Sequence, residues 1–485
     1  MVRRLWHARL LALGATAALL GHAGCSPHCR NEPLEVYDPN AGYRFDVLEP
    51  GLANGDQTFV CLTFSGGGTR AAALAYGVLL GLRDTPIAPS DDSPRRTLLD
   101  EVDVISAVSG GAFIAAAYGL WEAQALDGRL ERDLLYRDVE SDLFSSLWRP
   151  QNLLRLGSVA FDTIDIAATY YDEELFERQT YTALLARRQR PFIVINATNM
   201  GIDRRFEFTQ DDFDLLGSDL ASVPLGLAVA ASSAAPVVFS PLRFRYYTGP
   251  PLCSVLEATL TDTDGRQRNA RRCEWAASLV PRTDGSSPPR HELDAPNHRY
   301  LYLMDGGVVD NLGVSYVLDA YRHGVIRRRI DDGRINRLVL IMVNATNRQP
   351  SDIERHESSP GILTAGVKAL FNGIDHNSAA LTQLVHLRLA KLPRHSNALC
   401  AECNERLQAS CPSAAEAANS ASRYPETFVI EVCFRDLTDP RLRDRFDRLE
   451  TSLALPRGDV DALIQAGQSL LKAHPEFRRL EQALR

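Results

Sequence analysis

The most reactive arrangement in the sequence is a serine in a turn of small residues. Ser109 follows Ala107 and Val108 and precedes Gly110 and Gly111. Small neighbours let a strand and a helix approach closely and leave the serine hydroxyl exposed on a strained turn, as in the G-x-S-x-G nucleophile elbow. Ala107 replaces the first glycine of that pattern and adds one methyl group. Alone, the same serine could simply cap a helix that begins at Gly110.

A glycine-rich loop is the second candidate for chemistry. Gly66, Gly67 and Gly68 separate an apolar run from a helical stretch. Consecutive glycines allow backbone N–H groups to point outward at a helix N-terminus, where they can hold a phosphate or the oxyanion of a tetrahedral intermediate. No Gly-Lys-Ser/Thr ends the loop, so it is not a Walker loop. A purely structural turn is the alternative, and a phosphate-binding module would leave the other motifs unexplained.

A carboxylate followed by two glycines is the third candidate. Asp305 precedes Gly306 and Gly307 and follows an apolar run. At the end of a buried strand, its side chain can face the same sheet edge as Ser109 and accept the serine proton. An ordinary Asp-Gly turn is the alternative, and Asp310 is a rival carboxylate. The histidines considered after Asp305 do not lie in a strand-end turn with small neighbours, as a triad histidine would: His323, His356, His376 and His386.

A sheet must bring these three motifs to one edge, and the pattern of apolar runs predicts such a sheet. Strands are predicted at Thr58–Phe64, Val102–Val108, Phe192–Ala197, Tyr300–Met304, Leu338–Val343 and Phe428–Cys433. Helices are predicted at Ala71–Leu82, Gly110–Trp121 and Val460–Leu471. Uninterrupted apolar strands are typical of parallel sheets that are covered on both faces. Strands and helices in alternation indicate an α/β layer architecture.

The three motifs, in this order and after apolar strands, resemble those of the patatin-like phospholipase family. The family's oxyanion loop matches Gly66–Arg70, although Ala71 stands where the fuller pattern ends in glycine. Its elbow matches Val108–Gly111, and its D-G-[AG] motif matches Asp305–Gly307. The stretch Ala230–Pro236 is similar to a block common in bacterial members. The similarity extends from Phe59 to about Ala345, with Phe428–Leu471 as a continuation.

This resemblance implies a three-layer α/β fold with a mainly parallel central sheet and helices on both faces. It also implies a Ser109–Asp305 dyad in place of a Ser-His-Asp triad, with no metal or other cofactor. The loop Gly66–Gly68 would hold the oxyanion. Arg70 would steady the loop, contact a lipid phosphate, or form a structural salt bridge.

The function implied is that of a phospholipase A-type hydrolase, which cleaves carboxylic esters of membrane or host lipids through an acyl-enzyme. A general carboxylesterase or thioesterase is the alternative among enzymes. A catalytically silent surface lipoprotein is the alternative from another class, because a fold does not establish a function. The presence of both Ser109 and Asp305 counts against that alternative.

The N-terminus predicts export. Arginines precede an apolar run from Leu10 to Leu20, and small residues follow it, as in a secretory signal. Cys25 after Ala23 and Gly24 resembles a bacterial lipobox, although His22 stands where leucine is usual. Lipidation of Cys25 would anchor the protein to a membrane surface of the cell envelope, in the outer membrane or facing the periplasm. Ordinary cleavage near Ala23 is the alternative.

The remaining organisation follows from composition. We predict a signal peptide at 1–24, an N-terminal arm at 25–57, a catalytic domain at 58–345 with a polar insertion at about 243–299, and a continuation of the same domain at 346–485 with a cysteine-containing loop at about 394–425. A disulfide between Cys253 and Cys273 would close the insertion. Clustered aromatic and leucine residues in 141–185 are either core or a surface that meets lipid. A net charge of −8 argues against nucleic acid as a partner.

Overall fold

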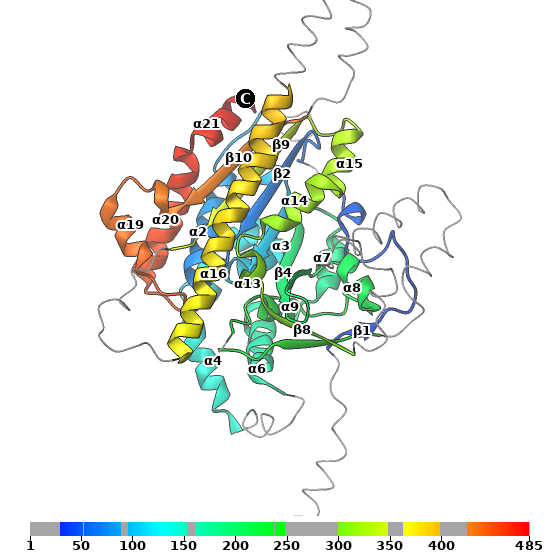
Figure 1. Ribbon diagram of the computed structural model, residues 1–485, viewed down its shortest axis with the longest axis vertical. Helices are drawn as coiled ribbons and strands as arrows, with labels where there is room; N and C mark the ends of the chain where they lie inside the picture. The colour runs from blue at the N-terminus through cyan, green and yellow to red at the C-terminus, as the bar shows by residue number, and fades with distance from the viewer. Residues whose placement is uncertain are drawn as a thin grey trace, which may run out of the picture.

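An eight-stranded mixed sheet forms the centre of the molecule and lies between two layers of helices (Figure 1). The computed structural model describes residues 30–51, 53–88, 96–150, 152, 161–236, 238–247, 299–347, 362–397 and 424–484. The predicted signal segment, Cys25, the predicted disulfide partners Cys253 and Cys273, and almost all of the two polar loops lie outside these residues. The predicted α/β fold, with a mainly parallel sheet and helices on both faces, is confirmed.

Parallel strands make up one side of the sheet, in the order β10-β9-β2-β3-β4. They are β2 (Thr58–Phe64), β3 (Val102–Val108), β4 (Phe192–Asn199), β9 (Arg337–Asn344) and β10 (Glu426–Cys433). Every residue of β2 and β3 is buried, as expected for strands covered on both faces. Cys61 in β2 is a buried free thiol. The sequence predictions for these five strands are confirmed.

Antiparallel strands complete the other side. β8 (Tyr300–Asp305) pairs with β4 and with β7 (Leu242–Arg245), and β5 (Arg204–Glu207) also pairs with β4. The expectation that residues 300–304 are buried on both faces is wrong. Tyr300 and Tyr302 are 37% and 43% exposed, whereas Leu301 and Leu303 between them are buried. In the sequence pattern the tyrosines were counted as apolar residues, but the hydroxyl end of a tyrosine can face water. The run at 300–304 therefore forms a strand that is buried on one face only.

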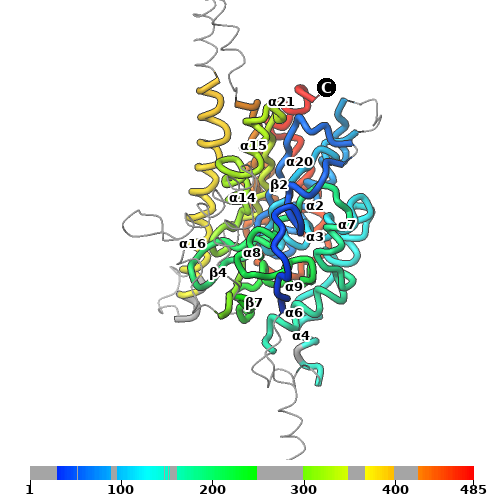
Figure 2. The backbone as a smooth tube through the Cα atoms, turned by 90° about the vertical axis from the view of Figure 1, so that its right-hand side faces the viewer, coloured from blue at the N-terminus to red at the C-terminus, as the bar shows by residue number. Residues whose placement is uncertain are grey.

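Helices cover both faces of this sheet, as the two perpendicular views show (Figures 1 and 2). One layer contains α2 (Gly68–Arg83), α3 (Gly110–Trp121) and α20 (Arg457–Ala473). The opposite layer contains α14 (Val314–Arg322), α15 (Val325–Asp331) and α16 (Ile362–Val385). None of the described helices combines the length and the apolar character needed to cross a bilayer.

Shorter elements connect these layers. The other α-helices are α4 (Val139–Leu147), α6 (Thr163–Tyr170), α7 (Tyr181–Arg187), α8 (Gln210–Leu215), α9 (Leu225–Ser232), α13 (Gly307–Asp310), α19 (Pro440–Asp447) and α21 (Pro475–Ala483). Single turns are η1 (Phe45–Val47), η2 (Leu98–Glu101), η3 (Glu122–Leu126), η4 (Glu131–Leu135), η5 (Tyr171–Leu175), η7 (His386–Lys391) and η8 (Phe434–Asp436). A two-stranded sheet joins β1 (Glu32–Pro33) to β6 (Ser218–Asp219).

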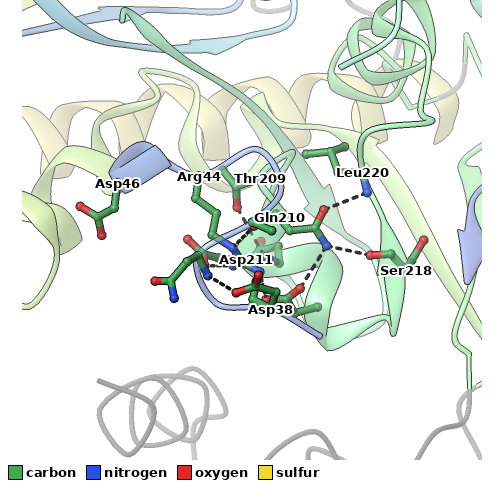
Figure 3. A network of polar contacts seen from close by, with 12 residues as sticks. Asp38, Arg44, Asp46, Thr209, Gln210, Asp211, Ser218 and Leu220 are labelled. Atoms are coloured by element: carbon green, nitrogen blue, oxygen red, sulfur yellow. Dashed lines mark hydrogen bonds and ion pairs between the residues drawn. The ribbon is translucent and has the colours of Figure 1, made fainter. Parts of the chain in front are cut away.

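Polar contacts fasten the N-terminal arm to α8 (Figure 3). The buried Arg44 guanidinium pairs with Asp211 and, at 2.6 Å, with Asp214. Gln210 donates to the Ser218 carbonyl at 2.9 Å and accepts the Leu220 N–H at 3.0 Å. Because Arg44 and Asp214 are both almost fully buried, removing either partner would leave an uncompensated charge in the interior. The arm is therefore an integral part of the fold.

Candidate active site

Ser109 lies in a sharp turn between β3 and α3. Its backbone has φ 48° and ψ −120°, a conformation that is costly for any residue other than glycine. Its side chain makes no capping bond to α3, so the helix-cap alternative does not describe this serine. A Cβ atom added at Gly110 would lie 2.1 Å from the Gly68 carbonyl oxygen. The elbow and the glycine loop are therefore in direct backbone contact, which only glycine permits at position 110.

Asp305 reaches the elbow from the far side of β4. The register pairs Val108 with Asn196 and Ala197 with Asp305, so the residue after Val108 lies level with Asp305 across the sheet. The Ser109 hydroxyl forms a hydrogen bond with the Asp305 carboxylate, and the Gly307 N–H donates to its Oδ1 at 2.8 Å. Burial raises the pKa of Asp305 to about 6, although both hydrogen bonds act to lower it. The structure thus brings together the two residues that the sequence paired.

Asp310, the other candidate carboxylate, has a structural role. Asp310 is buried and accepts the N–H groups of Leu312 at 3.1 Å and Ser315 at 2.7 Å. These bonds order the start of α14. His323 ends α14 and is exposed, and no hydrogen bond joins it to Ser109 or Asp305 in the described part of the chain. His356 lies outside the described residues.

The glycine loop offers fewer free donors than the sequence suggested. Gly66–Gly68 was expected to hold the oxyanion, but the Gly66 N–H donates to the Asn311 carbonyl at 3.0 Å and so is already engaged. The acceptor lies in the turn between α13 and α14, far away in the sequence, which a glycine pattern does not reveal. The N–H groups of Gly67 and Gly68 have no acceptor among the described residues. Gly68 has φ 60° and begins α2, where the helix dipole favours negative charge.

Arg70 connects the glycine loop to two segments that are distant in the sequence. Its guanidinium is buried and donates to the carbonyls of Ala345 at 3.0 Å and Leu449 at 2.6 Å, and to the Thr451 hydroxyl at 3.3 Å. The neighbouring Thr69 N–H donates to the Ser452 carbonyl at 2.8 Å. Burial lowers the pKa of Arg70 to about 10, which leaves it protonated at neutral pH. Of the roles considered for Arg70, these contacts fit steadying of the loop.

Two further features were not singled out by sequence reasoning. A small apolar hollow lies beside the loop and the elbow, and its lining comprises Gly68, Thr69, Ala72, Gly110, Phe113, Leu134, Leu135, Val139 and Leu453. In addition, the Ser232 hydroxyl accepts the Ser109 N–H at 2.8 Å. Ser232 belongs to the Ala230–Pro236 stretch that carries part of the resemblance, which was the one available signal. The hollow has no such signal, because its lining comes from segments that are distant in sequence.

Comparisons with known proteins place these residues in one family region. The family model described as Patatin-like phospholipase matches residues 62–318, a span that includes the glycine loop, Ser109 and Asp305. No curated protein sequence matches. The structure of human GIVD cytosolic phospholipase A2 matches with 14% identity and a TM-score of 0.45, over 88% of this chain and 60% of that chain. VipD from Legionella pneumophila matches with 12% identity and a TM-score of 0.26, over 85% and 67%. This chain thus spans 60% of the human phospholipase chain.

Proposed function

Since the chain belongs to the patatin-like phospholipase family, we propose that it hydrolyses carboxylic esters of lipids, with Ser109 as nucleophile and Asp305 as base. One observation carries this proposal. The hydroxyl of a serine in a strained elbow is hydrogen-bonded to a carboxylate whose pKa burial has raised to about 6. A serine hydroxyl is a poor nucleophile until a base takes its proton, and here the base is in place.

The reaction proceeds in two halves. Asp305 accepts the hydroxyl proton while Ser109 Oγ attacks the ester carbonyl, and the resulting oxyanion is held by the N–H groups of Gly67 and Gly68. The tetrahedral intermediate collapses, the bond to the alcohol breaks, and protonated Asp305 returns the proton to the leaving oxygen. Water then attacks the acyl-enzyme and gives its proton to Asp305. The second intermediate collapses, the bond to Ser109 Oγ breaks, and Asp305 returns its proton to that oxygen, which releases the fatty acid and restores both residues.

The raised pKa of Asp305 suits this role. An ordinary aspartate, with a pKa of about 3.9, is a weak base at neutral pH. A base with a pKa of about 6 is still ionised at pH 7.5, and it holds a transferred proton more firmly. Burial is the main cause of the shift, so a closed, water-poor site is part of the proposed mechanism.

An apolar acyl group is the substrate part that the site favours. The hollow beside Gly68 and Gly110 is lined mainly by side chains without charge, among them Phe113, Leu134 and Leu453. Such a lining is chemically suited to a hydrocarbon chain, and its side chains would have to separate to admit one. We place the acyl chain there and the head group outside, which favours a lipid over the alternatives of a general carboxylesterase or thioesterase. A silent surface lipoprotein would have no need of the Ser109–Asp305 hydrogen bond.

We further propose that the protein is exported and anchored by lipid on Cys25, at a membrane surface of the cell envelope. The support is the sequence pattern of a charged start, an apolar run and small residues before Cys25. The anchor would hold the enzyme next to its substrate. A disulfide between Cys253 and Cys273 is proposed on the same grounds of export and cysteine spacing.

Covalent labelling tests the central proposal. Purified protein is treated with a long-chain alkyl fluorophosphonate, which phosphonylates activated serines, and is digested for mass spectrometry. We expect one adduct, on Ser109, and loss of hydrolysis of a phospholipid in mixed micelles in proportion to labelling. The Ser109→Ala variant is the control and should take up no label. Absence of an adduct on folded wild-type protein, or an adduct on another serine, would refute the proposal.

A further inference from the structure

We infer that Ser232 is a positioning residue, which holds the nucleophile and the base of the dyad in register with each other through one hydroxyl and one carbonyl. This inference rests on the proposed function, because it concerns the geometry of Ser109 and Asp305. Ser232 is the last residue of α9 and its side chain is completely buried. Its hydrogen bonds go to main-chain groups and not to the reacting oxygens, so its effect must pass through its neighbours.

The hydroxyl side of Ser232 holds the nucleophile. Its Oγ accepts the Ser109 N–H at 2.8 Å and donates its own proton to the Asn196 carbonyl at 2.6 Å. Since the hydroxyl has only one proton, these two bonds require it to act as acceptor and donor at once. Among buried side chains of this size, only a hydroxyl can do both. Alanine can do neither, and a thiol is weak in both roles.

The carbonyl of the same residue holds the turn that carries the base, Asp305. The Gly306 N–H donates to the Ser232 carbonyl at 3.1 Å, and the Asp305 N–H donates to the Ala234 carbonyl at 3.0 Å. Two main-chain bonds thus fix the turn that carries the carboxylate. A segment of three residues therefore bridges the Ser109 turn and the Asp305 turn, which are almost 200 residues apart in the chain.

Because the backbone of Ser109 is strained, the bridge through Ser232 is needed to keep the Ser109 hydroxyl in place. With φ 48°, the Ser109 N–H takes no part in the strand or helix pattern, and the Ser232 hydroxyl is its acceptor. If that acceptor is lost, a partly buried N–H is left unpaired and the turn is free to relax. The hydroxyl of Ser109 then moves away from Asp305. A displacement of about 1 Å in a reacting group can lower a rate about 100-fold.

A network of hydrogen bonds between β4 and β3 holds the Asn196 carbonyl, to which Ser232 donates. The Asn196 side chain is buried and donates to Ser106 Oγ at 2.9 Å and to the Ala107 carbonyl at 3.0 Å. Ser106 Oγ in turn donates to the Gly313 carbonyl at 2.7 Å. These bonds fix β4 against β3 directly beneath the elbow. The Asn196 carbonyl that receives the Ser232 proton is therefore itself held in place.

The chain provides a matched control in the next residue. Ser233 is also a buried serine, but its hydroxyl donates to the Val229 carbonyl of its own helix at 2.8 Å. Within the described ranges, that hydroxyl makes no bond to the elbow or to the Asp305 turn. Ser233→Ala removes the same atom from the same helix end, so any general effect of losing a buried hydroxyl there should appear in both variants.

The experiment measures how fast Ser109 is phosphonylated by the alkyl fluorophosphonate, from intact mass against time, at pH 5 to 8.5. This readout needs no lipid substrate. We expect Ser232→Ala to react on the order of 100-fold more slowly than wild type. Ser232→Thr, which keeps a hydroxyl, should recover most of the rate. Ser233→Ala should react at the wild-type rate.

The pH profile separates positioning from simple loss of stability. Because the Ser109 hydrogen bond lowers the pKa of Asp305, its loss in Ser232→Ala should move the acid limb of the profile to higher pH. A merely less stable protein would keep the limb in place. Equal rates for Ser232→Ala and Ser233→Ala, or a slow Ser232→Ala with an unmoved limb, would overturn the inference. If Ser232→Ala does not fold, Ser232→Cys takes its place with the same expectations. Labelling of wild type without lipid hydrolysis would contradict the proposed substrate and leave the positioning result valid.

Discussion

At the scale of single residues, the dyad should behave as one unit. Ser109→Ala removes the nucleophile and Asp305→Asn removes the base, so each should reduce kcat for ester hydrolysis to background. The double variant should be scarcely worse than either single variant, because groups that act in one step are not additive. The measurement is the rate of fatty-acid release, with circular dichroism to verify folding. Additive losses would show that the two residues act independently.

Variants of the rival groups serve as controls for this result. Asp310→Asn retains an oxygen that can accept the Leu312 N–H, and it should keep substantial activity. His323→Ala lies at an exposed position and should also remain active. An inactive but folded histidine variant, together with an active Asp305→Asn, would replace the dyad with a triad.

The raised pKa of Asp305 predicts opposite pH dependences for activity and stability. The base must be ionised, so kcat/KM should fall as the pH drops through about 6. The folded pKa lies above the unfolded value of about 3.9, so the folded state binds more protons between these values and loses stability as the pH rises through that interval. Asp305→Asn, which cannot ionise, should therefore melt at a higher temperature than wild type at pH 7.5. A lower melting temperature would contradict the burial of an ionised Asp305.

The residues of the site differed in how readily sequence revealed them. Ser109, Asp305 and the glycines stand in short patterns that turns impose locally, and the structure brings them together. The engaged Gly66 N–H and the Ser232 hydroxyl depend on partners far away in the chain, Asn311 and Ser109 respectively. Local patterns carry no information about such partners.

At the scale of elements, strands buried on both faces were predictable to within two residues at either end. Their apolar runs are uninterrupted, and β2 and β3 match the predicted bounds in full. Strand direction was not predictable from the same pattern. β8 is antiparallel and has one exposed face, and its tyrosines were counted as apolar. Pairing partners decide direction, and these are set by the whole fold.

The contact between α2 and α20 predicts a sensitive position. A Cβ atom on Gly77 would lie 2.2 Å from the Ile464 carbonyl oxygen, a backbone atom that cannot rotate away. Gly77→Ala should therefore destabilise the protein by about 1–3 kcal/mol, in spite of the better helix propensity of alanine. Chemical denaturation measures this change. Gly373→Ala in α16 is the control, since nothing lies within 4 Å of its added Cβ, and it should be neutral or stabilising. Equal effects would contradict the close packing.

The aromatic cluster in 141–185 divides into two parts. Tyr170 and Tyr171 are buried core residues, whereas Phe144 and Trp148 are 62% and 65% exposed at the end of α4, which projects from the lower end of the molecule in Figure 1. Trp148→Ala should reduce activity on aggregated lipid several-fold and leave hydrolysis of a soluble short-chain ester unchanged. Tryptophan is favoured where one side is apolar and the other wet. Equal losses on both substrates would assign Trp148 a structural role instead.

At the scale of the whole molecule, the site depends on segments outside the matched family region. The Arg70 guanidinium and the Thr69 N–H bind carbonyls at 449 and 452, well beyond residue 318. The α20 helix packs directly on α2, which carries the glycine loop at its N-terminus. The C-terminal segment at 424–484 therefore contributes directly to the packing that supports the proposed active site.

The proposed anchor makes a prediction for the whole protein in its cell. Wild type should partition with membranes, and its mature N-terminal peptide should carry diacylglycerol on Cys25. Cys25→Ser removes the thiol that accepts the lipid, so this variant should appear in the soluble fraction with an unmodified N-terminus. Fractionation and intact-mass measurement check both points. A Cys25→Ser protein that stays on the membrane with the wild-type mature mass would exclude the anchor.

The support of the oxyanion loop by residues 449–452 has a consequence for the timing of biosynthesis. A ribosome completes the glycine loop, the elbow and the Asp305 turn long before it reaches the residues that hold Thr69 and Arg70. A nascent chain that ends before residue 449 has the nucleophile and the base but lacks the partners that order the oxyanion donors. In the proposed mechanism, the oxyanion donors are therefore fully ordered only when residues 449–452 are in place.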